Sequence, residues 1–204
     1  MREQYWVNSI TYEQAKPWIL DIHYAHRMPS VSFAYGLYTP KVHDDGELRS
    51  ELVGIVTYGS PASPSLCKGV CGVEHKQDVI ELNRLVLKYN RKNEASILVS
   101  NSLKYLPQPK IVVSYADVGG QGHTGYVYQA TNFLFTGTTR PRTDIAGKDG
   151  KHSRHHLGDV TKRVDRTAKH RYVYFTGNKR ECKVFRNALR YPIMDYPKPQ
   201  EDMT

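Results

Sequence analysis

The chain has 204 residues, 39% of them hydrophobic, which is enough to bury a core and close to the usual length of one domain. No apolar run is long enough to span a bilayer, and the first residues, MREQYWVNSI, lack the basic and apolar segments of a secretory signal, so we expect a soluble protein of the cytoplasm. The formal net charge of +9 is concentrated in residues 138–190, where 15 Lys and Arg stand against 5 Asp and Glu, and this asymmetry indicates a polyanion such as nucleic acid as partner.

The first part of the chain predicts a strand, a helix and a hairpin. Residues 4–10 alternate weakly and indicate a strand, and Thr11 can cap a helix that ends near His23. The β-rich runs 31–38 and 52–58 flank a polar, turn-like segment, which is typical of an antiparallel hairpin.

The segment 59–76 is rich in proline and glycine and predicts a loop, followed by a strand at 79–88. Cys67 and Cys71 lie in this loop, four positions apart instead of the three typical of a zinc knuckle. The chain has three cysteines, the last being Cys182, and we interpret all of them as reduced thiols and not as metal ligands.

The middle of the chain has the pattern of alternating helices and strands. Asn93 is a good N-cap residue for a buried helix that stops at Pro107. The apolar run 110–117 predicts a strand in the middle of a sheet. A glycine-rich turn then leads to a second helix at about 124–132.

The remaining residues predict two strands, at 133–137 and 170–177, on either side of a basic insertion at about 138–170. A basic helix at 179–189 and a flexible tail at about 192–204 complete the chain. The whole order predicts a single α/β (α+β) domain over 1–204, with a mixed, largely antiparallel sheet and helices on both faces.

The connection YNRKNEAS between the strand at 79–88 and the next helix is a candidate phosphate cradle. The amino end of a helix offers free N–H groups and a positive dipole end, and Arg91 and Lys92 add positive charge. An ordinary strand-to-helix connection with solvated bases explains the same residues equally well. The spacing of a Walker loop and the glycine fingerprint for dinucleotides are both absent.

This arrangement resembles the GNAT acyltransferase fold. The resemblance implies an acyl-CoA (acetyl-CoA) between the fourth and fifth strands, with its pyrophosphate on the helix that follows the fourth strand. It also implies that Tyr128 protonates the leaving thiolate, although Tyr128 can equally be a packing residue. The implied coenzyme-binding residues are Arg84, Arg91, Lys92, Asn93, Glu94, Ala95 and Ser96.

A narrower resemblance rests on three longer strings, ELNRLVLKYNRKNEASILVS, VSYADVGGQGHTGYVYQATNFLFTGTT and KHRYVYFTG. They resemble the Mom family of bacteriophage DNA-modification proteins. The resemblance implies an enzyme of the host cytoplasm that converts the 6-amino group of adenine in duplex DNA to the N6-carbamoylmethyl (acetamido) form. This modification protects phage DNA from host restriction endonucleases.

Several side chains suit such chemistry. Asp117 ends a strand at the edge where open sheets bind ligands, Ser114 lies on the face expected for the coenzyme, and His123 lies on the following turn. The Mom resemblance implies a bound iron, for which we select His23, Tyr24 and Asp117 as ligands. Asp117 can instead be a turn-forming aspartate, and structural roles explain His123 and Arg84 as well.

The implied product also raises a chemical difficulty. A carbamoylmethyl group is bonded to adenine through its CH2 carbon, so simple acetyl transfer cannot produce it. The amine of a paired adenine is accessible only when the base is flipped out of the duplex.

The insertion from Arg140 to Arg171 mixes cations with glycines and predicts a flexible loop that binds DNA phosphates more than base edges. The predicted DNA-binding residues are Arg140, Arg142, Lys148, Lys151, Arg154, Lys162 and Arg163. Two other functions are compatible with the sequence: a conventional GNAT enzyme that acetylates a protein or a small amine, and a non-catalytic DNA-binding protein.

Overall fold

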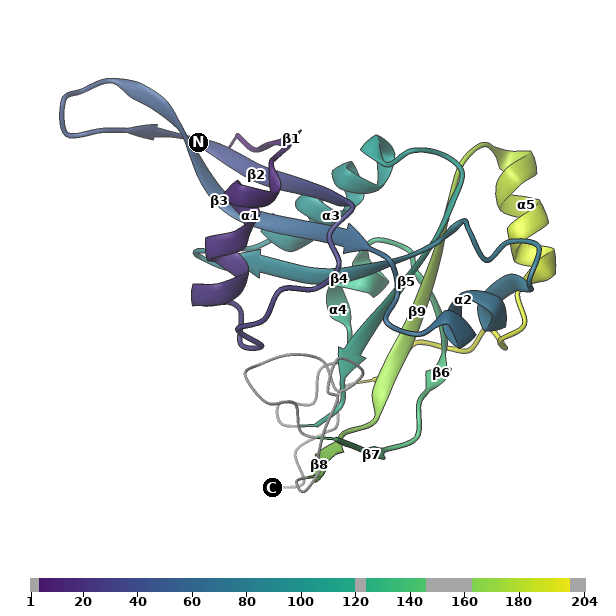
Figure 1. Ribbon diagram of the computed structural model, residues 1–204. Helices are drawn as coiled ribbons and strands as arrows, with labels where there is room; N and C mark the ends of the chain where they lie inside the picture. The colour runs from purple at the N-terminus through teal and green to yellow at the C-terminus, as the bar shows by residue number, and fades with distance from the viewer. Residues whose placement is uncertain (1–3, 120–123, 146–162, 199–204) are drawn as a thin grey trace.

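A computed structural model describes residues 4–119, 124–145 and 163–198 (Figure 1). The elements in chain order are β1 (Trp6–Ser9), α1 (Tyr12–Pro17), the π-helical turn η1 (Trp18–Ile22), β2 (Phe33–Val42), β3 (Leu48–Gly59), α2 (Pro64–Cys71), β4 (Val79–Leu87), α3 (Glu94–Tyr105), β5 (Lys110–Asp117), α4 (Tyr126–Ala130), β6 (Leu134–Thr138), β7 (Arg142–Ile145), β8 (Arg163–Arg166), β9 (Lys169–Thr176) and α5 (Lys179–Ala188). This order confirms the expected succession of the main strands and helices.

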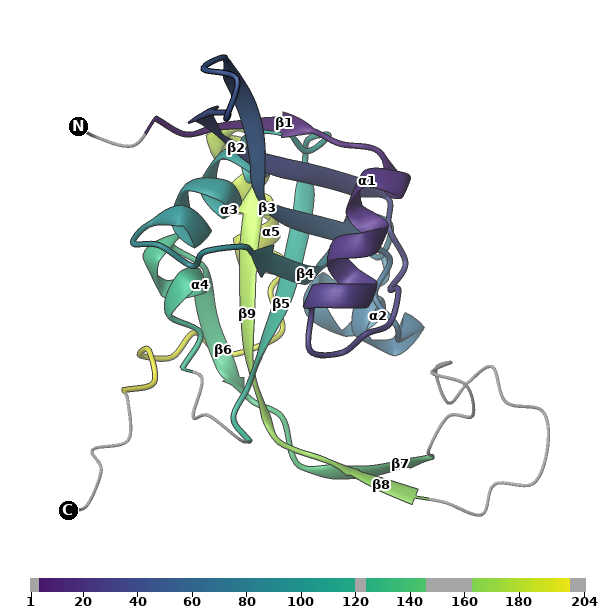
Figure 2. The same ribbon diagram turned by 90° about the vertical axis from the view of Figure 1, so that its left-hand side faces the viewer.

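Seven of the strands form one sheet in the order β1-β2-β3-β4-β5-β9-β6. Neighbouring strands are antiparallel except β4 and β5, which are parallel. Helices α3 and α4 cover one face of this sheet, and α1, α2 and α5 cover the other (Figures 1 and 2). The predicted fold class, a mixed and largely antiparallel sheet between two helical layers, is therefore confirmed.

Strand β5 shows how one apolar run serves both layers. Ile111 and Val113 pack towards α2 and α5, whereas Val112 and Ala116 pack towards α3 and α4. Because neither face of this strand is exposed to solvent, neither carries a row of polar side chains, which explains the continuous apolar sequence.

The predicted first helix begins at its predicted cap. Thr11 and Gln14 form a capping box, in which each side chain bonds the backbone N–H of the other residue. The helix continues through η1 and ends at His23. Ala15 and Ile19 are fully buried against the sheet.

The prediction of a loop over 59–76 was wrong, because α2 lies inside it. Pro64 occupies the first turn of this helix, where a missing N–H costs nothing. Val70 and Cys71 bury the helix against the sheet. All three cysteines are free thiols.

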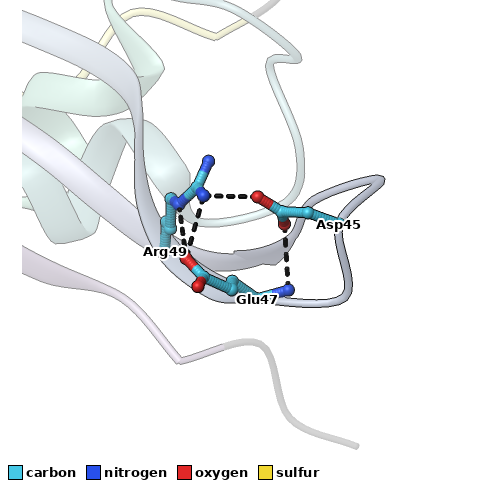
Figure 3. Close-up of polar contacts among 3 residues, drawn as sticks. All are labelled: Asp45, Glu47 and Arg49. Carbon is cyan, nitrogen blue, oxygen red and sulfur yellow. Dashed lines mark hydrogen bonds and ion pairs between the residues drawn. The ribbon is translucent and has the colours of Figure 1, made fainter.

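The β2–β3 hairpin is longer than predicted and closes over a polar turn (Figure 3). The Glu47 N–H donates to Asp45 at 3.0 Å, and the Arg49 guanidinium bonds Asp45 as well as Glu47, the latter at 2.8 Å. These contacts extend the paired strands to Val42 and Leu48.

The chain beyond α5 packs along β6 up to Tyr196, where a fraying tail was expected. The Met194 N–H donates to the Phe135 carbonyl at 2.9 Å, and the Tyr196 hydroxyl donates to the Phe133 carbonyl at 2.8 Å. No helix in the described parts of the chain is long and apolar enough to cross a membrane.

Candidate active site

The parallel pairing of β4 with β5 is short and ends inside the sheet. Only Val79–Glu81 pair with Ile111–Val113, and beyond these residues the two strands diverge (Figure 1). We call the backbone from Leu82 to Arg84 and from Ser114 to Asp117 the β4–β5 divergence. At this point the Ser114 hydroxyl donates to the Leu82 carbonyl at 3.0 Å, so a side chain replaces the missing strand partner.

Glu81 lies where the pairing ends and is a residue that sequence reasoning missed. Burial raises the pKa of its carboxyl group above the ordinary value, while the Ala62 N–H and the charges of Arg84 and Lys169 act in the opposite direction. A half-buried carboxylate with a raised pKa is suited to accept a proton. The available signal was a single acid within the apolar run VIELNRLVL.

Arg84 is a polar anchor of the same strand. Its guanidinium donates to the Asn83 carbonyl at 2.6 Å and to the Arg27 carbonyl at 3.0 Å. Burial lowers the pKa of Arg84, and its buried Nε has no hydrogen-bond partner within the described structure. A buried donor without a partner is costly, so this N–H is available to an acceptor on a ligand.

Tyr128, on α4, approaches the divergence from the other face of the sheet. It is buried near Ser114, and burial raises its pKa to about 12, while Ser114 acts in the opposite direction. Tyr24 and Glu81 are close enough to raise that pKa further. Tyr128 is therefore a protonated phenol at neutral pH and can act as a proton donor.

His23 and Tyr24 follow η1, and their rings stack with centroids 4.3 Å apart. His23 is buried, and burial together with the charges of Arg84 and His26 lowers its pKa to about 4. Tyr24, in contrast, is 79% exposed. The pair therefore presents a neutral imidazole inside and an aromatic ring to solvent.

Asp117, at the end of β5, contacts residues at the start of β9 through a hydrogen bond and an ion pair. Its carboxylate accepts hydrogen bonds from the Gly119 N–H at 3.0 Å and from the Thr167 hydroxyl, and Lys169 Nζ lies 3.7 Å away. Burial opposes ionisation of Asp117, but the bonds from Thr167 and Gly119 and the charge of Lys169 outweigh it and hold its pKa below the usual value. The bond to Gly119 is the turn-forming contact of the alternative interpretation.

The predicted iron ligands do not fit a metal site in this arrangement. His23 Nδ1 accepts the Ala25 N–H at 3.0 Å, so the proton of the neutral ring is on Nε2 and neither nitrogen has a free lone pair. Both carboxylate oxygens of Asp117 face protein donors. Within the described ranges no group of three or more His, Cys, Asp or Glu could hold a metal. We therefore derive no step through a metal.

The residues of the predicted phosphate cradle lie at the start of α3, but Glu94 has a structural role there. Asn93 is the N-cap residue, but it has a left-handed backbone with φ 68° and makes no side-chain capping bond. Glu94 is fully buried and accepts bonds from the Tyr5 hydroxyl at 3.0 Å and the Arg91 N–H at 2.8 Å. Glu94 therefore acts as a structural anchor, and its charge opposes an anion at this end of the helix.

The other residues of this cradle stay accessible. Arg91, Lys92 and Asn93 are exposed, and Ala95 and Ser96 are half-buried. Arg91 stacks on the ring of Tyr89 with its Cζ atom 4.6 Å from the centroid.

The basic insertion begins and ends as a two-stranded hairpin, β7–β8, which extends away from the main sheet (Figure 2). Arg142 lies opposite Arg166, and Ile145 lies opposite Arg163. Arg140, Arg142 and Arg163 are exposed. The predicted site residues Lys148, Lys151, Arg154, Lys162 and His123 lie outside the residues that the structure describes.

Two comparisons with known proteins agree with one another. The model of the Mom protein family matches residues 4–198. The chain is also similar to a protein of Escherichia phage Mu named methylcarbamoylase mom, with 28% identity over 192 residues, which cover 91% of this chain and 73% of that protein. The match of the family model over nearly the whole length shows that the chain belongs to the Mom protein family.

Proposed function

We propose that this chain is a phage DNA-modification enzyme that adds a carbamoylmethyl group to N6 of adenine in duplex DNA, in the cytoplasm of the host. Membership of the Mom protein family and the name of the phage Mu relative support the reaction class. The observation that carries the proposal is the convergence of Glu81, Arg84 and Tyr128 on the β4–β5 divergence, because it brings together a proton acceptor, a free buried donor and a proton donor.

The three side chains have distinct roles in an N-substitution. The N6 lone pair forms the new C–N bond, an N6–H bond breaks, and its proton passes to the carboxylate of Glu81. The leaving group departs with its bonding electrons and takes the proton of Tyr128. The N–H of Arg84 Nε donates a hydrogen bond to an acceptor atom on the molecule that supplies the carbamoylmethyl group. The step involves no net oxidation or reduction.

The product requires a particular kind of donor. Because the carbamoylmethyl group is attached through its CH2 carbon, the donor must carry its leaving group on that carbon. Attack on the carbonyl of an acyl thioester, with Tyr128 protonating the thiolate, gives an N6-acyl adenine instead. Conventional acetyl transfer to an amine is therefore the second candidate function, and the protonated phenol of Tyr128 favours it.

A coenzyme of the acyl-CoA class remains a proposed co-substrate, with its phosphates beside Lys92 and the first turn of α3. The positive charges of Arg91 and Lys92 support this placement, whereas the buried Glu94 weakens it. Iron likewise stays a prediction, which metal analysis of the purified protein tests.

A target adenine reaches these groups only when it is flipped out of the duplex. Tyr24 presents an exposed ring near both Arg84 and Tyr128, so it is suited to stack against the extruded base. The β7–β8 hairpin supplies exposed cations for the phosphates on either side of that base.

The test is chemical analysis of DNA from bacteria that express the chain. The DNA is digested to nucleosides and weighed by mass spectrometry, and we expect a deoxyadenosine that carries the mass of a carbamoylmethyl group. Glu81→Gln should strongly reduce the amount of this nucleoside, whereas Glu13→Gln, at an exposed position on α1, should not. An acetylated nucleoside would select the second candidate, and unmodified DNA bound by the purified protein would indicate a non-catalytic DNA-binding protein.

A further inference from the structure

Helix α5 carries basic residues that the proposed reaction does not use. Phe185 is buried against the sheet with its ring centroid 6.0 Å from that of Phe175, and Cys182 and Ala188 are half-buried on the same side. The exposed side of the helix carries four cations, Lys179, Arg180, Lys183 and Arg186. At 1.5 Å per residue, they form a stripe about 10 Å long.

The single acid of α5 does not neutralise this stripe. Glu181 accepts the Asn178 N–H at 2.7 Å, and Asn178 in turn accepts the N–H groups of Arg180 at 2.9 Å and Glu181 at 3.0 Å. This capping box uses the carboxylate at the start of the helix. Within the part of the chain that the structure describes, none of the four cations forms an ion pair.

The stripe is unfavourable for the helix itself. Lys179 and Lys183 are four residues apart and repel each other, as do Lys183 and Arg186 at a spacing of three. Lys179 and Arg180 lie in the first turn, beside the positive end of the helix dipole. Folding of α5 does not require these charges, so they point to a partner that neutralises them.

The chemistry of the stripe identifies the class of partner. A basic amphipathic helix can lie on a membrane, but the apolar side of α5 is buried in the protein and Val184 is the exposed apolar residue of the helix. A line of cations on a rigid helix complements a regular line of negative charges, which duplex DNA presents on its phosphate backbone. We infer that α5 is a second contact for the DNA backbone, and this inference rests on the proposed function in taking DNA as the substrate.

The position of α5 separates this contact from the basic hairpin. Strand β9 has the β8 strand before it and α5 after it (Figure 1). Its eight residues span about 26 Å at roughly 3.3 Å per residue. DNA rises by about 3.4 Å per base pair. A duplex must therefore be longer than about 8 base pairs to contact both α5 and the hairpin.

The experiment compares two variants of equal charge in the full-length protein. Lys179→Gln with Lys183→Gln neutralises two cations of α5, and glutamine keeps the helix. Lys16→Gln with Lys104→Gln removes two exposed charges from α1 and α3 as the matched control. Binding to fluorescent duplexes of about 8 and about 24 base pairs is measured by anisotropy over a range of salt concentrations.

We expect the parent protein to bind the long duplex more tightly than the short one, and the α5 variant to show little of this difference. On the long duplex, its log–log salt slope should fall by up to about 2, since each phosphate that is no longer neutralised lowers the slope by roughly 0.9. The control variant should keep the parental slope. Parental slopes in the α5 variant, or a parent that does not bind duplex DNA, would overturn the inference.

Adenine modification is measured in parallel, so that the two proposals can fail separately. If DNA stays unmodified while binding depends on α5, the proposed reaction fails and the DNA contact stands. If DNA is modified while the α5 variant binds with the parental salt slope, the contact fails and the reaction stands.

Discussion

The Ser114 hydroxyl and the Leu82 carbonyl oxygen lie 3.0 Å apart, one residue beyond the last paired positions of β4 and β5. This bond uses the proton of Ser114 and satisfies a buried backbone group that has left the ladder. Ser114 therefore shapes the site beside Tyr128, and its buried hydroxyl is not a free nucleophile.

Ser114→Ala tests this structural role. Removal of the hydroxyl leaves the Leu82 carbonyl buried without a donor, which costs about 1–3 kcal/mol, so the melting temperature should fall. Modification should decrease but persist, because Glu81 and Tyr128 remain. Ser65→Ala, at an exposed position on α2, is the matched control. Full stability together with complete loss of modification would instead make Ser114 a catalytic residue.

Glu81→Gln should raise the stability of the protein and lower its activity. Burial raises the pKa of Glu81 in the folded state, so its ionised form opposes folding once the pH exceeds that pKa. The glutamine variant should therefore melt at a higher temperature than the parent at neutral pH. Its modification rate should fall by at least about 100-fold, the usual loss when a general base is removed.

The pH profile gives an independent measurement of the same group. The parental rate should fall on the acid side as Glu81 takes up a proton, at a pH above the ordinary range of a glutamate. An acid limb that is unchanged in Glu81→Gln would assign the proton acceptor to another residue.

His23 should make stability depend on pH between about 6.5 and 4. Burial lowers its folded pKa to about 4, so below its ordinary pKa of 6.5 the unfolded chain gains a proton that the folded chain excludes. The free energy of unfolding should fall by about 1.4 kcal/mol for each unit of this pKa difference. Denaturant titrations across the window should show a flatter profile for His23→Gln than for the control His43→Gln.

The coenzyme proposal is tested by thermal denaturation. Acetyl-CoA at 100 times its dissociation constant should stabilise the fold by about 2.7 kcal/mol, and Arg91→Ala with Lys92→Ala should weaken this effect. Lys16→Ala with Lys104→Ala removes equal charge elsewhere as the control. A melting temperature that stays constant at millimolar coenzyme would remove acyl-CoA as a co-substrate.

The β7–β8 hairpin should contribute to DNA binding through phosphates. Arg140→Glu with Arg163→Glu should lower both the affinity and the salt slope, by about 0.9 for each phosphate that the hairpin no longer neutralises, with little dependence on DNA sequence. Any stabilisation by acetyl-CoA should be unaffected in this variant. A salt slope equal to that of the parent would mean that the hairpin is a solvated surface.

Local patterns in the sequence were sufficient for most of the fold. The apolar run at 110–117 predicted a strand in the middle of a sheet, and Pro107 marked the end of the helix before it. Helix α2 was missed because the prolines and glycines of 59–76 indicate a loop, whereas the stability of the helix comes from packing Val70 and Cys71 against the sheet. That contribution depends on strands elsewhere in the chain.

Prediction of the site was limited in the same way, by contacts between residues that are distant along the chain. Arg84, Ser114 and Tyr128 were selected in advance, and the structure brings them together at the β4–β5 divergence. Glu81 was not selected, because its significance depends on the Ala62 N–H and on Lys169, which are distant in sequence. Glu94 was expected to contact phosphate, yet it bonds Tyr5, which lies 89 positions away.

Helix α5 packs against the sheet on its inner side and carries its exposed cations on its outer side. Asn178, Glu181 and Phe185 secure the helix from its inner side and its first turn, so the outer cations can change without a loss of folding free energy. If α5 contacts the DNA backbone as inferred, substitutions there should alter how long the protein stays on DNA and how readily it slides along the duplex. Binding to DNA could then change without any change in the proposed chemistry at Glu81.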